Sequence, residues 1–254
     1  GGQANTNSTH GSSNFDGTIQ SKVTANVTAG FSIVSYTGNG STNQTAGHGL
    51  GVTPKIKIIK NRDNTGSWTV TGSVLGTDVR KFLDLGDASG SPSGYYPANS
   101  SSTIGISGSN NPSGHNTNTE KYICYCFADV KGFSSFGKYR ANDQDGDNSV
   151  FVYTGFKPAL VWIKQISASR NWMIMDNKRL GYNDDNNELH IQNSDTENTG
   201  DTISLLSNGF KLQNSTGDLN YSTNDYLYFA WAEEPLVTST GLPTTAGWLS
   251  NQIL

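Results

Sequence analysis

Residues 51–60 read GVTPKIKIIK, and residues 155–164 read GFKPALVWIK. A glycine, a proline, an isoleucine and a lysine recur in register, each shifted by 104 positions (155 − 51). The same shift relates Tyr122 to Tyr226 much further along, although the sequence between the two motifs diverges. Agreement in register across two separated motifs indicates an internal duplication. The chain is therefore predicted to contain two copies of one unit.

The strands of this unit follow from the alternation of apolar and polar residues. Residues 55–60 alternate until their end: Ile56 and Ile58 are expected to face a core, while Lys55 and Lys57 face water. The matching stretch 159–164 is apolar on both faces, so it is expected to be covered on both sides by the other copy, a subunit or a long loop. Short strands between Gly, Asn and Ser turns are typical of β-sandwiches.

We therefore expect an all-β protein with two tandem β-sandwich-like domains, long polar loops and little helix. The expected order is an N-terminal arm or linker (1–29), a first sandwich repeat (30–131), a second repeat (132–235) and a C-terminal tail (236–254). Within the arm, residues 18–27 alternate weakly and are compatible with one further strand. The two repeats are called copy one and copy two below.

Composition limits the classes of partner. The 254 residues include 17 basic and 21 acidic side chains, with a net charge of −4 and no basic stripe. Nucleic acid is therefore not an expected partner, because its phosphates require such a stripe. No apolar run approaches the roughly 20 residues that span a bilayer, so no membrane span is expected. Since the first residue is Gly1, the N-terminus is expected to be processed or the chain to be part of a longer one.

Two cysteines, Cys124 and Cys126, lie on one predicted strand and share a face. This is a poor geometry for a disulfide, and we interpret them as small buried apolar groups. Copy two has Tyr228 and Ala230 at these positions, so the shared fold does not require thiols. His190 does not repeat in copy one either, and we interpret it as a loop or edge histidine.

No catalytic constellation is recognised, and the chain is not expected to be an enzyme. Asp143, Asp145 and Asp147 form a D-x-D-G-D cluster, whose carboxylate spacing suits calcium ligands. The cluster departs from an EF-hand loop, because the glycine comes early and Thr154 stands where a glutamate is needed. A solvated hairpin turn is the other interpretation. The acidic loop at residues 184–188 has the same two interpretations.

Four aromatic residues need separate interpretations. Tyr95 and Tyr96 lie in a polar Gly/Ser loop where no core is expected. Exposed tyrosines supply rigid contact area at recognition surfaces, so this pair is a candidate ligand-binding site. Anchoring of the loop to its own domain is the alternative. Trp68 and Trp172 occupy equivalent places in the two copies, which favours a core or structural role over sugar stacking.

Three stretches carry a family resemblance: GFSIVSYTGNG at residues 30–40, HGLGVTP at 48–54 and FVYTGFKP at 151–158. They resemble β-rich repeat domains of virion proteins from tailed bacteriophages of marine bacteria and cyanobacteria. In that family such repeats lie in long fibre-like or appendage-like proteins. The resemblance covers about residues 14–235 and supplies no catalytic residues.

The resemblance implies a structural protein of a bacteriophage virion, in a tail fibre or receptor-binding appendage at the surface of the extracellular particle. The implied partners are further copies of the chain, other virion proteins, and a glycan or protein of the host surface. A trimer is the symmetry common among phage fibres. Two alternatives stay open: a capsid decoration or head-fibre protein without a receptor role, and a glycan-degrading or glycan-binding extracellular module.

The duplication also indicates where a specific site should lie. Features that differ between the copies are not needed for the shared fold, whereas the shared Gly, Pro and Trp positions are framework. The thiols, the Asp143 to Asp147 cluster and the Tyr95–Tyr96 loop all fail to repeat. A specific site is therefore expected among such differences.

Overall fold

A computed structural model of the chain describes residues 11–76, 79–86, 96–107, 113–179, 183, 187–200 and 202–233. Helical structure in these residues is confined to α1 (Ser113–Asn116) and the 3-10 helix η1 (Gly146–Asn148). The all-β class with sandwich-like sheets, predicted from the sequence, is confirmed. Neither helix has the length or the apolar character needed to cross a membrane.

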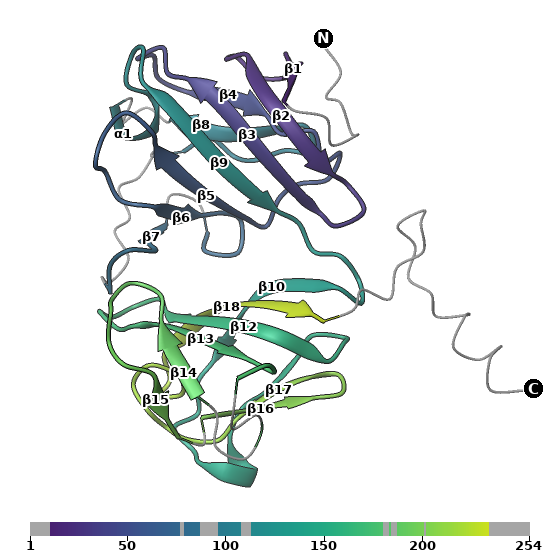
Figure 1. Cartoon of the computed structure of the whole chain (residues 1–254), viewed down its shortest axis with the longest axis vertical. Coiled ribbons are helices and arrows are strands. Elements are labelled where there is room, and N and C mark those ends of the chain that lie inside the picture. Colours follow the sequence, from purple (N-terminus) through teal and green to yellow (C-terminus); the bar gives the residue numbers. More distant parts are fainter. Residues whose placement is uncertain are drawn as a thin grey trace, which may run out of the picture.

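Copy one is a sandwich of two antiparallel sheets (Figure 1). Its large sheet contains, in spatial order, β1 (Ser12–Asn14), β2 (Ser21–Asn26), β3 (Phe31–Thr37), β9 (Lys121–Phe127), β5 (Ile56–Asn61), β6 (Thr69–Thr71) and β7 (Arg80–Phe82). Its small sheet pairs β4 (Gln44–Gly47) with β8 (Thr103–Ser107). Strands β1 and β2 come from the segment predicted as an arm, and they extend the large sheet beside β3.

Copy two repeats this arrangement. Its large sheet contains β10 (Ser134–Arg140), β18 (Asp225–Ala232), β12 (Pro158–Gln165), β13 (Trp172–Asp176), β14 (Asn187–His190) and β15 (Asn198–Thr199). Its small sheet contains β11 (Phe151–Tyr153), β17 (Gly209–Leu212) and β16 (Ile203–Leu206). The order β10-β18-β12-β13-β14 matches the order β3-β9-β5-β6-β7, so the duplication in sequence is a duplication in topology.

Each sandwich has its own apolar core between its two sheets. In copy one, Val34 and Ile59 of the large sheet belong to the same buried cluster as Ile104 of the small sheet. In copy two, Val161 of the large sheet shares a cluster with Phe210 of the small sheet. Burying a side chain of this size contributes about 1.5–3 kcal/mol relative to leaving it in water.

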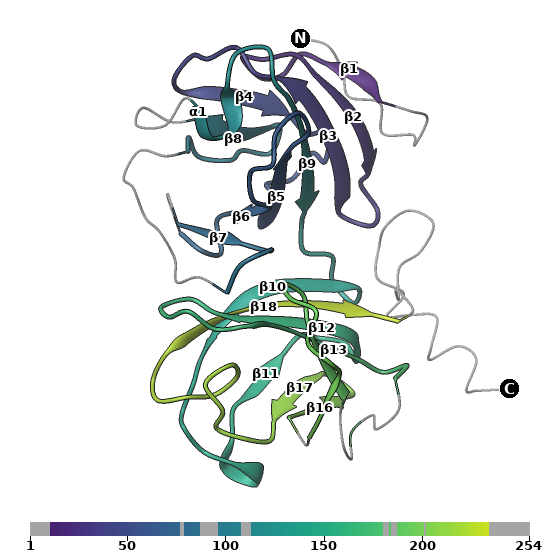
Figure 2. The same cartoon turned by 60° about the vertical axis from the view of Figure 1, so that its left-hand side comes forward.

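A third apolar cluster joins the outer faces of the two large sheets, which lie against each other in Figures 1 and 2. Ile58 of β5 belongs to it from copy one, and Phe229 of β18 belongs to it from copy two. Strand β12 contributes Val161 to the core of copy two and Trp162 to this third cluster. The second layer over the doubly apolar strand is therefore the other copy, which was one of the three expected covers. We call this cluster the seam.

Hydrogen bonds also cross the seam. The indole Nε1 of Trp172 donates to the carbonyl oxygen of Phe82 at 2.8 Å, and the Lys81 ammonium donates to the carbonyl oxygen of Ile166. Both donors are buried. A buried donor without an acceptor would cost free energy when the two sandwiches associate, and each of these bonds avoids that cost. The two sandwiches are thus joined by both apolar packing and buried hydrogen bonds.

Strand β5 alternates as predicted, but its two faces are reversed. Ile56 and Ile58 point into the seam, whereas Lys57 lies between the sheets of copy one with 1% of its surface exposed. The prediction that Lys57 faces water is wrong. Alternation identifies residues that share a face, and copy two covers the face that a lone sandwich would leave to solvent.

Candidate functional site

The two copies share a stacked pair of tyrosines. The ring centroids of Tyr36 and Tyr122 are 5.2 Å apart, as are those of Tyr139 and Tyr226. The hydroxyl of Tyr36 donates to the carbonyl oxygen of His115 at 2.8 Å, and the equivalent bond in copy two measures 2.6 Å. Equal geometry in both copies assigns these tyrosines to the framework.

A buried asparagine is repeated in the same way. The side-chain Nδ2 of Asn116 donates to Asn39 Oδ1 at 2.8 Å, and that of Asn220 donates to Asn142 Oδ1 at 3.1 Å. In return, the backbone N–H of Asn39 or Asn142 donates to the buried asparagine at 3.0 Å. Buried amides must be satisfied, and both copies achieve this identically. These contacts therefore serve the fold and not a site of one copy.

The interiors differ most around Lys57. Copy one has buried or half-buried polar side chains where copy two continues its apolar core. The polar residues are Lys57, Thr69, Thr71, Asn99 and His115, and the shift of 104 positions aligns them with Val161, Met173, Met175, Ile203 and Leu219. Since copy two forms the same sandwich with apolar residues at these places, the polar set of copy one is not required by the fold.

Lys57 lies at the centre of this polar set. Its ammonium donates to Asn99 Oδ1 at 3.0 Å and to the carbonyl oxygen of Gly105, and it lies 4.9 Å from the centre of the Tyr96 ring. Burial lowers the pKa of the ammonium to about 8, because the charged form loses its hydration. At neutral pH the group still carries its charge and faces uncharged partners.

His115 closes one side of the polar set. Its Nδ1 lies 2.8 Å from the Tyr96 hydroxyl, and its Nε2 lies 3.0 Å from Thr69 Oγ1. Burial lowers the pKa of His115 to about 3, with further repulsion from Lys57 and Arg80. The imidazole is therefore neutral at physiological pH and orders Tyr96 by hydrogen bonding.

A cavity of about 220 Å³ lies beside these residues. Its wall includes Lys57, Thr71, Ser73, Tyr96, Pro97 and Asn99. The Asn99 Oδ1 atom accepts from Lys57 and from the backbone N–H of Gly105, at 3.0 and 3.1 Å, whereas Asn99 Nδ2 has no partner within the described residues. A cation and a spare amide donor thus meet at one cavity, an arrangement suited to binding an anion with hydrogen-bonding groups.

The structure describes one of the two tyrosines predicted as a ligand site. Tyr95 lies outside the described residues, whereas Tyr96 is buried and bonded to His115. The Tyr96 hydroxyl bond is the one expected of a loop anchor. Its ring also lines the cavity, so the structure brings this predicted residue to the candidate site.

The three predicted calcium ligands are not brought together. Asp143 Oδ1 accepts from the backbone N–H of Ser222 at 3.0 Å, Asp147 lies 3.5 Å from the ammonium of Lys211, and Asp145 precedes η1 without a side-chain cap bond. Among the described residues, no group of three or more His, Cys, Asp or Glu side chains is placed to hold a metal ion. The calcium interpretation therefore stays a prediction without geometric support.

The thiols and tryptophans have structural positions. Cys124 and Cys126 are free and buried, with their Sγ atoms 3.7 Å apart, as expected for small buried groups. Burial raises the pKa of the Cys124 thiol, which makes it a poor nucleophile. Trp172 is buried in the seam and Trp68 is half-buried against it. The interpretation of both tryptophans as structural is confirmed.

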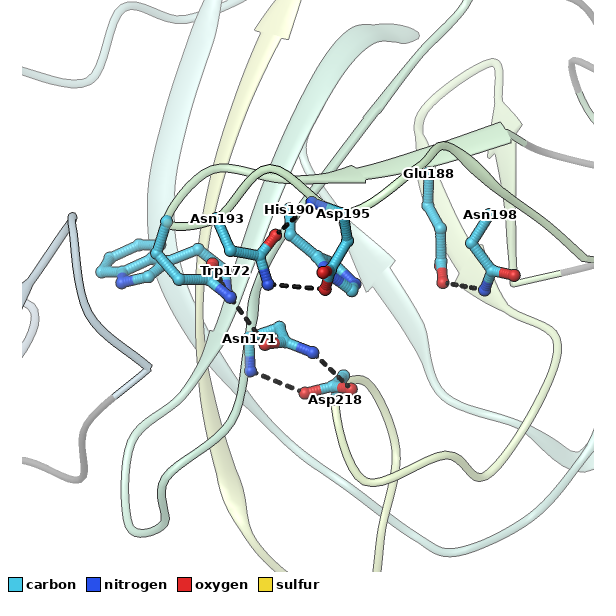
Figure 3. A network of polar contacts seen from close by, with 9 residues as sticks. Asn171, Trp172, Glu188, His190, Asn193, Asp195, Asn198 and Asp218 are labelled. Atoms are coloured by element: carbon cyan, nitrogen blue, oxygen red, sulfur yellow. Dashed lines mark hydrogen bonds and ion pairs between the residues drawn. The ribbon is translucent and has the colours of Figure 1, made fainter.

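A second polar network, in copy two, connects β14 with the segment that follows it (Figure 3). His190 Nδ1 lies 3.2 Å from Asp195 Oδ2, and Glu188 Oε1 accepts from Asn198 at 2.7 Å. Burial raises the pKa of Glu188. These bonds tie neighbouring parts of one sheet edge. Residues 184 and 185 of the predicted acidic loop lie outside the described residues.

Sequence reasoning missed Lys57, Asn99 and His115 as site residues. Their burial was not predicted, because they come from a strand, a loop and a helix that are distant in sequence. The signal that finds them is the alignment of the copies, which pairs each of them with an apolar residue.

Comparison with known proteins shows a family relationship. No curated protein matches the chain, and no solved structure matches it. One family model matches residues 4–235, a span that includes both copies and the seam between them. The complete duplication is therefore one family unit. The chain belongs to the family described as Domain of unknown function (DUF7483).

Proposed function

We propose that the chain is a non-enzymatic structural and host-contacting module of a bacteriophage virion, in a tail fibre or receptor-binding appendage. Its place would be the outer surface of the extracellular particle, in a homo-oligomer for which we propose threefold symmetry. The resemblance of residues 30–40, 48–54 and 151–158 to virion repeat domains is the starting point of this proposal.

The seam supports a mechanical role. Phe127 of copy one packs on Phe136 and Trp231 of copy two, with ring centroids 5.8 and 6.2 Å apart, at the junction of the copies. Close-packed aromatic interfaces resist relative movement, because separating them exposes large apolar areas to water. A joined pair of sandwiches is a suitable rigid segment for an appendage.

The observation that carries the proposal is the asymmetry of the two interiors. Copy two keeps an apolar core, while copy one places Lys57, Asn99 and Tyr96 around a cavity. Unlike Lys81, whose buried ammonium donates across the seam, the Lys57 ammonium lies inside one sandwich and joins no second copy, although its desolvation costs several kcal/mol. The asymmetry therefore favours a structural role for copy two and a binding role for copy one, as expected for a module that contacts a host.

Two measurements test the proposal. Gold-labelled antibodies against the chain, applied to phage particles, are expected to mark the tail or its fibres, whereas label confined to the capsid would favour the decoration role. The purified chain is expected to form a stable oligomer by light scattering and to reduce phage adsorption when added to host cells. A chain absent from the particle, or one that leaves adsorption unchanged, would overturn the proposal.

The glycan-degrading alternative has its own assay. The chain is incubated with host polysaccharide, and new reducing ends are measured. We expect none, since no pair of carboxylates faces across the cavity of copy one among the described residues. Release of reducing ends would contradict the non-enzymatic proposal and assign hydrolase activity to the chain.

A further inference from the structure

Lys57 carries a charge that the described chain does not balance. Its partners are the amide oxygen of Asn99 and the carbonyl oxygen of Gly105, and it forms no ion pair with any described residue. A buried charge is normally paired, because uncharged partners replace only part of its lost hydration. An ammonium has three N–H donors, and the two observed bonds leave one for another acceptor.

The cavity beside Lys57 supplies the space for that acceptor. Its volume of about 220 Å³ corresponds to roughly seven water molecules, at about 30 Å³ each, which suits one small ring and not a long chain. Ser73 and the Nδ2 atom of Asn99 offer hydrogen bonds, while Tyr96 and Pro97 form a largely apolar wall. The wall, the amide and the cation together match a polar ring that bears a negative group.

Copy two shows what the same positions contain when no ligand has to be accommodated. Val161, Met175 and Ile203 stand at the places of Lys57, Thr71 and Asn99, and all three belong to the apolar core. Their side chains fill the interior, so the cation and the polar wall are additions of copy one. Such additions cost stability, and copy two folds without them.

We propose that this cavity binds the carboxylate-bearing ring of an acidic sugar, with the carboxylate on Lys57 and the sugar hydroxyls on Asn99 and Ser73. The inference rests on the proposed function, because it names the chemical class of the host ligand. The carboxylate neutralises the buried ammonium with a charge-assisted hydrogen bond, which is about twice as strong as a neutral one. Neutral sugars lack this bond and bind more weakly.

Proton binding gives the site a pH dependence. The other titratable groups around Lys57 are His48, Tyr96, His115, Cys124 and Cys126. Burial lowers the pKa of both histidines and raises that of the Cys124 thiol, so these three are neutral near pH 8. Because burial lowers the pKa of Lys57 to about 8, the affinity for a carboxylate is expected to fall above pH 8.

The experiment is a calorimetric titration of the full chain with D-glucuronate, D-glucose and acetate. We expect glucuronate to bind at least about tenfold more tightly than glucose or acetate, because neither control joins the charge to the ring. Equal affinity for acetate and glucuronate would reduce the site to a general carboxylate site and overturn the sugar assignment. No binding of glucuronate at millimolar concentration would overturn the proposal entirely.

Three variants locate the effect. Lys57→Met is expected to lose at least about tenfold in glucuronate affinity, and Lys60→Met, which removes a charge from the same strand outside the cavity, is expected to retain it. Asn99→Asp places a permanent carboxylate beside Lys57, so it is expected to abolish glucuronate binding while preserving or raising the melting temperature. Wild-type affinity in a folded Asn99→Asp chain would contradict the proposal.

Phage adsorption to host cells distinguishes failure of the sugar assignment from failure of the proposed host-contacting function. If wild-type chain and Lys57→Met inhibit phage adsorption equally, the sugar assignment fails and the virion role stands. If neither inhibits adsorption while glucuronate still binds wild-type chain through Lys57, the site stands and the host-contacting function fails.

Discussion

Copy one and copy two have the same strand order and the same buried tyrosine and asparagine contacts, yet their interiors differ in kind. Copy two encloses Met173, Met175 and Val161 in an apolar core. Copy one encloses Lys57, which forms no ion pair with any described carboxylate, and the neutral imidazole of His115. The comparison teaches that the fold needs its framework contacts and tolerates a polar interior, at a cost in stability.

The seam links the two halves of this comparison. Copy one carries the costly polar interior, and its outer face packs on the copy with the ordinary core. Association buries apolar area that neither sandwich buries alone, which offsets part of the cost.

Removing an aromatic ring from the seam is expected to have the largest effect. Phe229 is buried and has ring contacts with Phe136 at 5.7 Å and with Trp172 at 6.0 Å. Phe229→Ala is expected to lower the free energy of unfolding by about 3–5 kcal/mol in urea denaturation. Tyr125→Ala, at the equivalent position of copy one, is half-buried and should lose less. A loss below about 1 kcal/mol for Phe229→Ala would show that the seam contributes little.

Acid is expected to act on copy one through His115. Its pKa is about 3 in the folded state and about 6.5 in the unfolded state, so between these values only the unfolded state takes up the proton. The free energy of unfolding should therefore fall as the pH falls, by roughly 3 kcal/mol at pH 4 from this group. His115→Leu, which installs the residue of copy two, removes this contribution from the pH profile.

The matched control for acid sensitivity is Thr71→Met, which installs another residue of copy two without removing a titratable group and is expected to keep the wild-type profile. Both variants are compared by urea denaturation between pH 4 and pH 7. Parallel profiles for wild-type chain and His115→Leu would contradict the assignment, whatever the absolute stability of the variant.

Alkali is expected to act through Lys57 in the opposite range. The folded pKa of about 8 lies below the ordinary value of 10.5, so between them only the unfolded state keeps the proton. Stability should rise from pH 8 to pH 10 by about 2 kcal/mol from this group. Lys57→Met is expected to lose this rise and Lys60→Met to retain it, as measured by denaturant midpoints. An unchanged rise in Lys57→Met would place the titrating group elsewhere.

The shared framework should respond equally in the two copies. Tyr36→Phe and Tyr139→Phe each leave one buried carbonyl oxygen without its hydroxyl donor. Each is expected to cost about 1–2 kcal/mol by thermal or urea unfolding, with the two losses within about 0.5 kcal/mol of each other. A difference larger than about 1 kcal/mol would show that the tyrosine pair serves more than the fold in one copy.

Calcium removal is expected to have the smallest effect. Because Asp143 and Asp147 are engaged separately, with Ser222 and Lys211, excess chelator should shift the melting temperature by less than about 1 °C. A clear fall with chelator, restored by calcium, would support the metal interpretation of Asp143, Asp145 and Asp147.

Periodicity predicted the architecture but not which side of a strand is inside. The doubly apolar stretch 159–164 correctly indicated a second covering layer, because one solvated face would have carried polar residues. The alternation in residues 55–60 led to the wrong prediction for Lys57. That prediction assumes that the polar face of a strand is exposed to solvent, and it fails where a second domain covers the other face. Strand β1 carries no apolar pattern at all, because its Ser12–Asn14 backbone pairs at an edge.

The candidate site could be predicted only in outline. Comparing the copies indicated that a site lies among their differences, and Tyr96, named because it lies in a polar Gly/Ser loop, is one of those differences. Asn99 and His115 have no distinguishing pattern in the sequence. They are recognised as site residues only in the folded chain, where they lie near Lys57 and Tyr96. Such convergence depends on long-range pairing, which the local pattern of a chain does not encode.

The seam also makes the chain its own optical reporter. Four of the five tryptophans, Trp68, Trp162, Trp172 and Trp231, belong to the seam, and the fifth, Trp248, lies outside the described residues. The cavity of copy one is lined by a tyrosine and no tryptophan among the described residues. Tryptophan emission from these four residues therefore follows separation of the sandwiches, while tyrosine absorbance includes events around Lys57, so the two signals distinguish opening of the seam from occupation of the cavity.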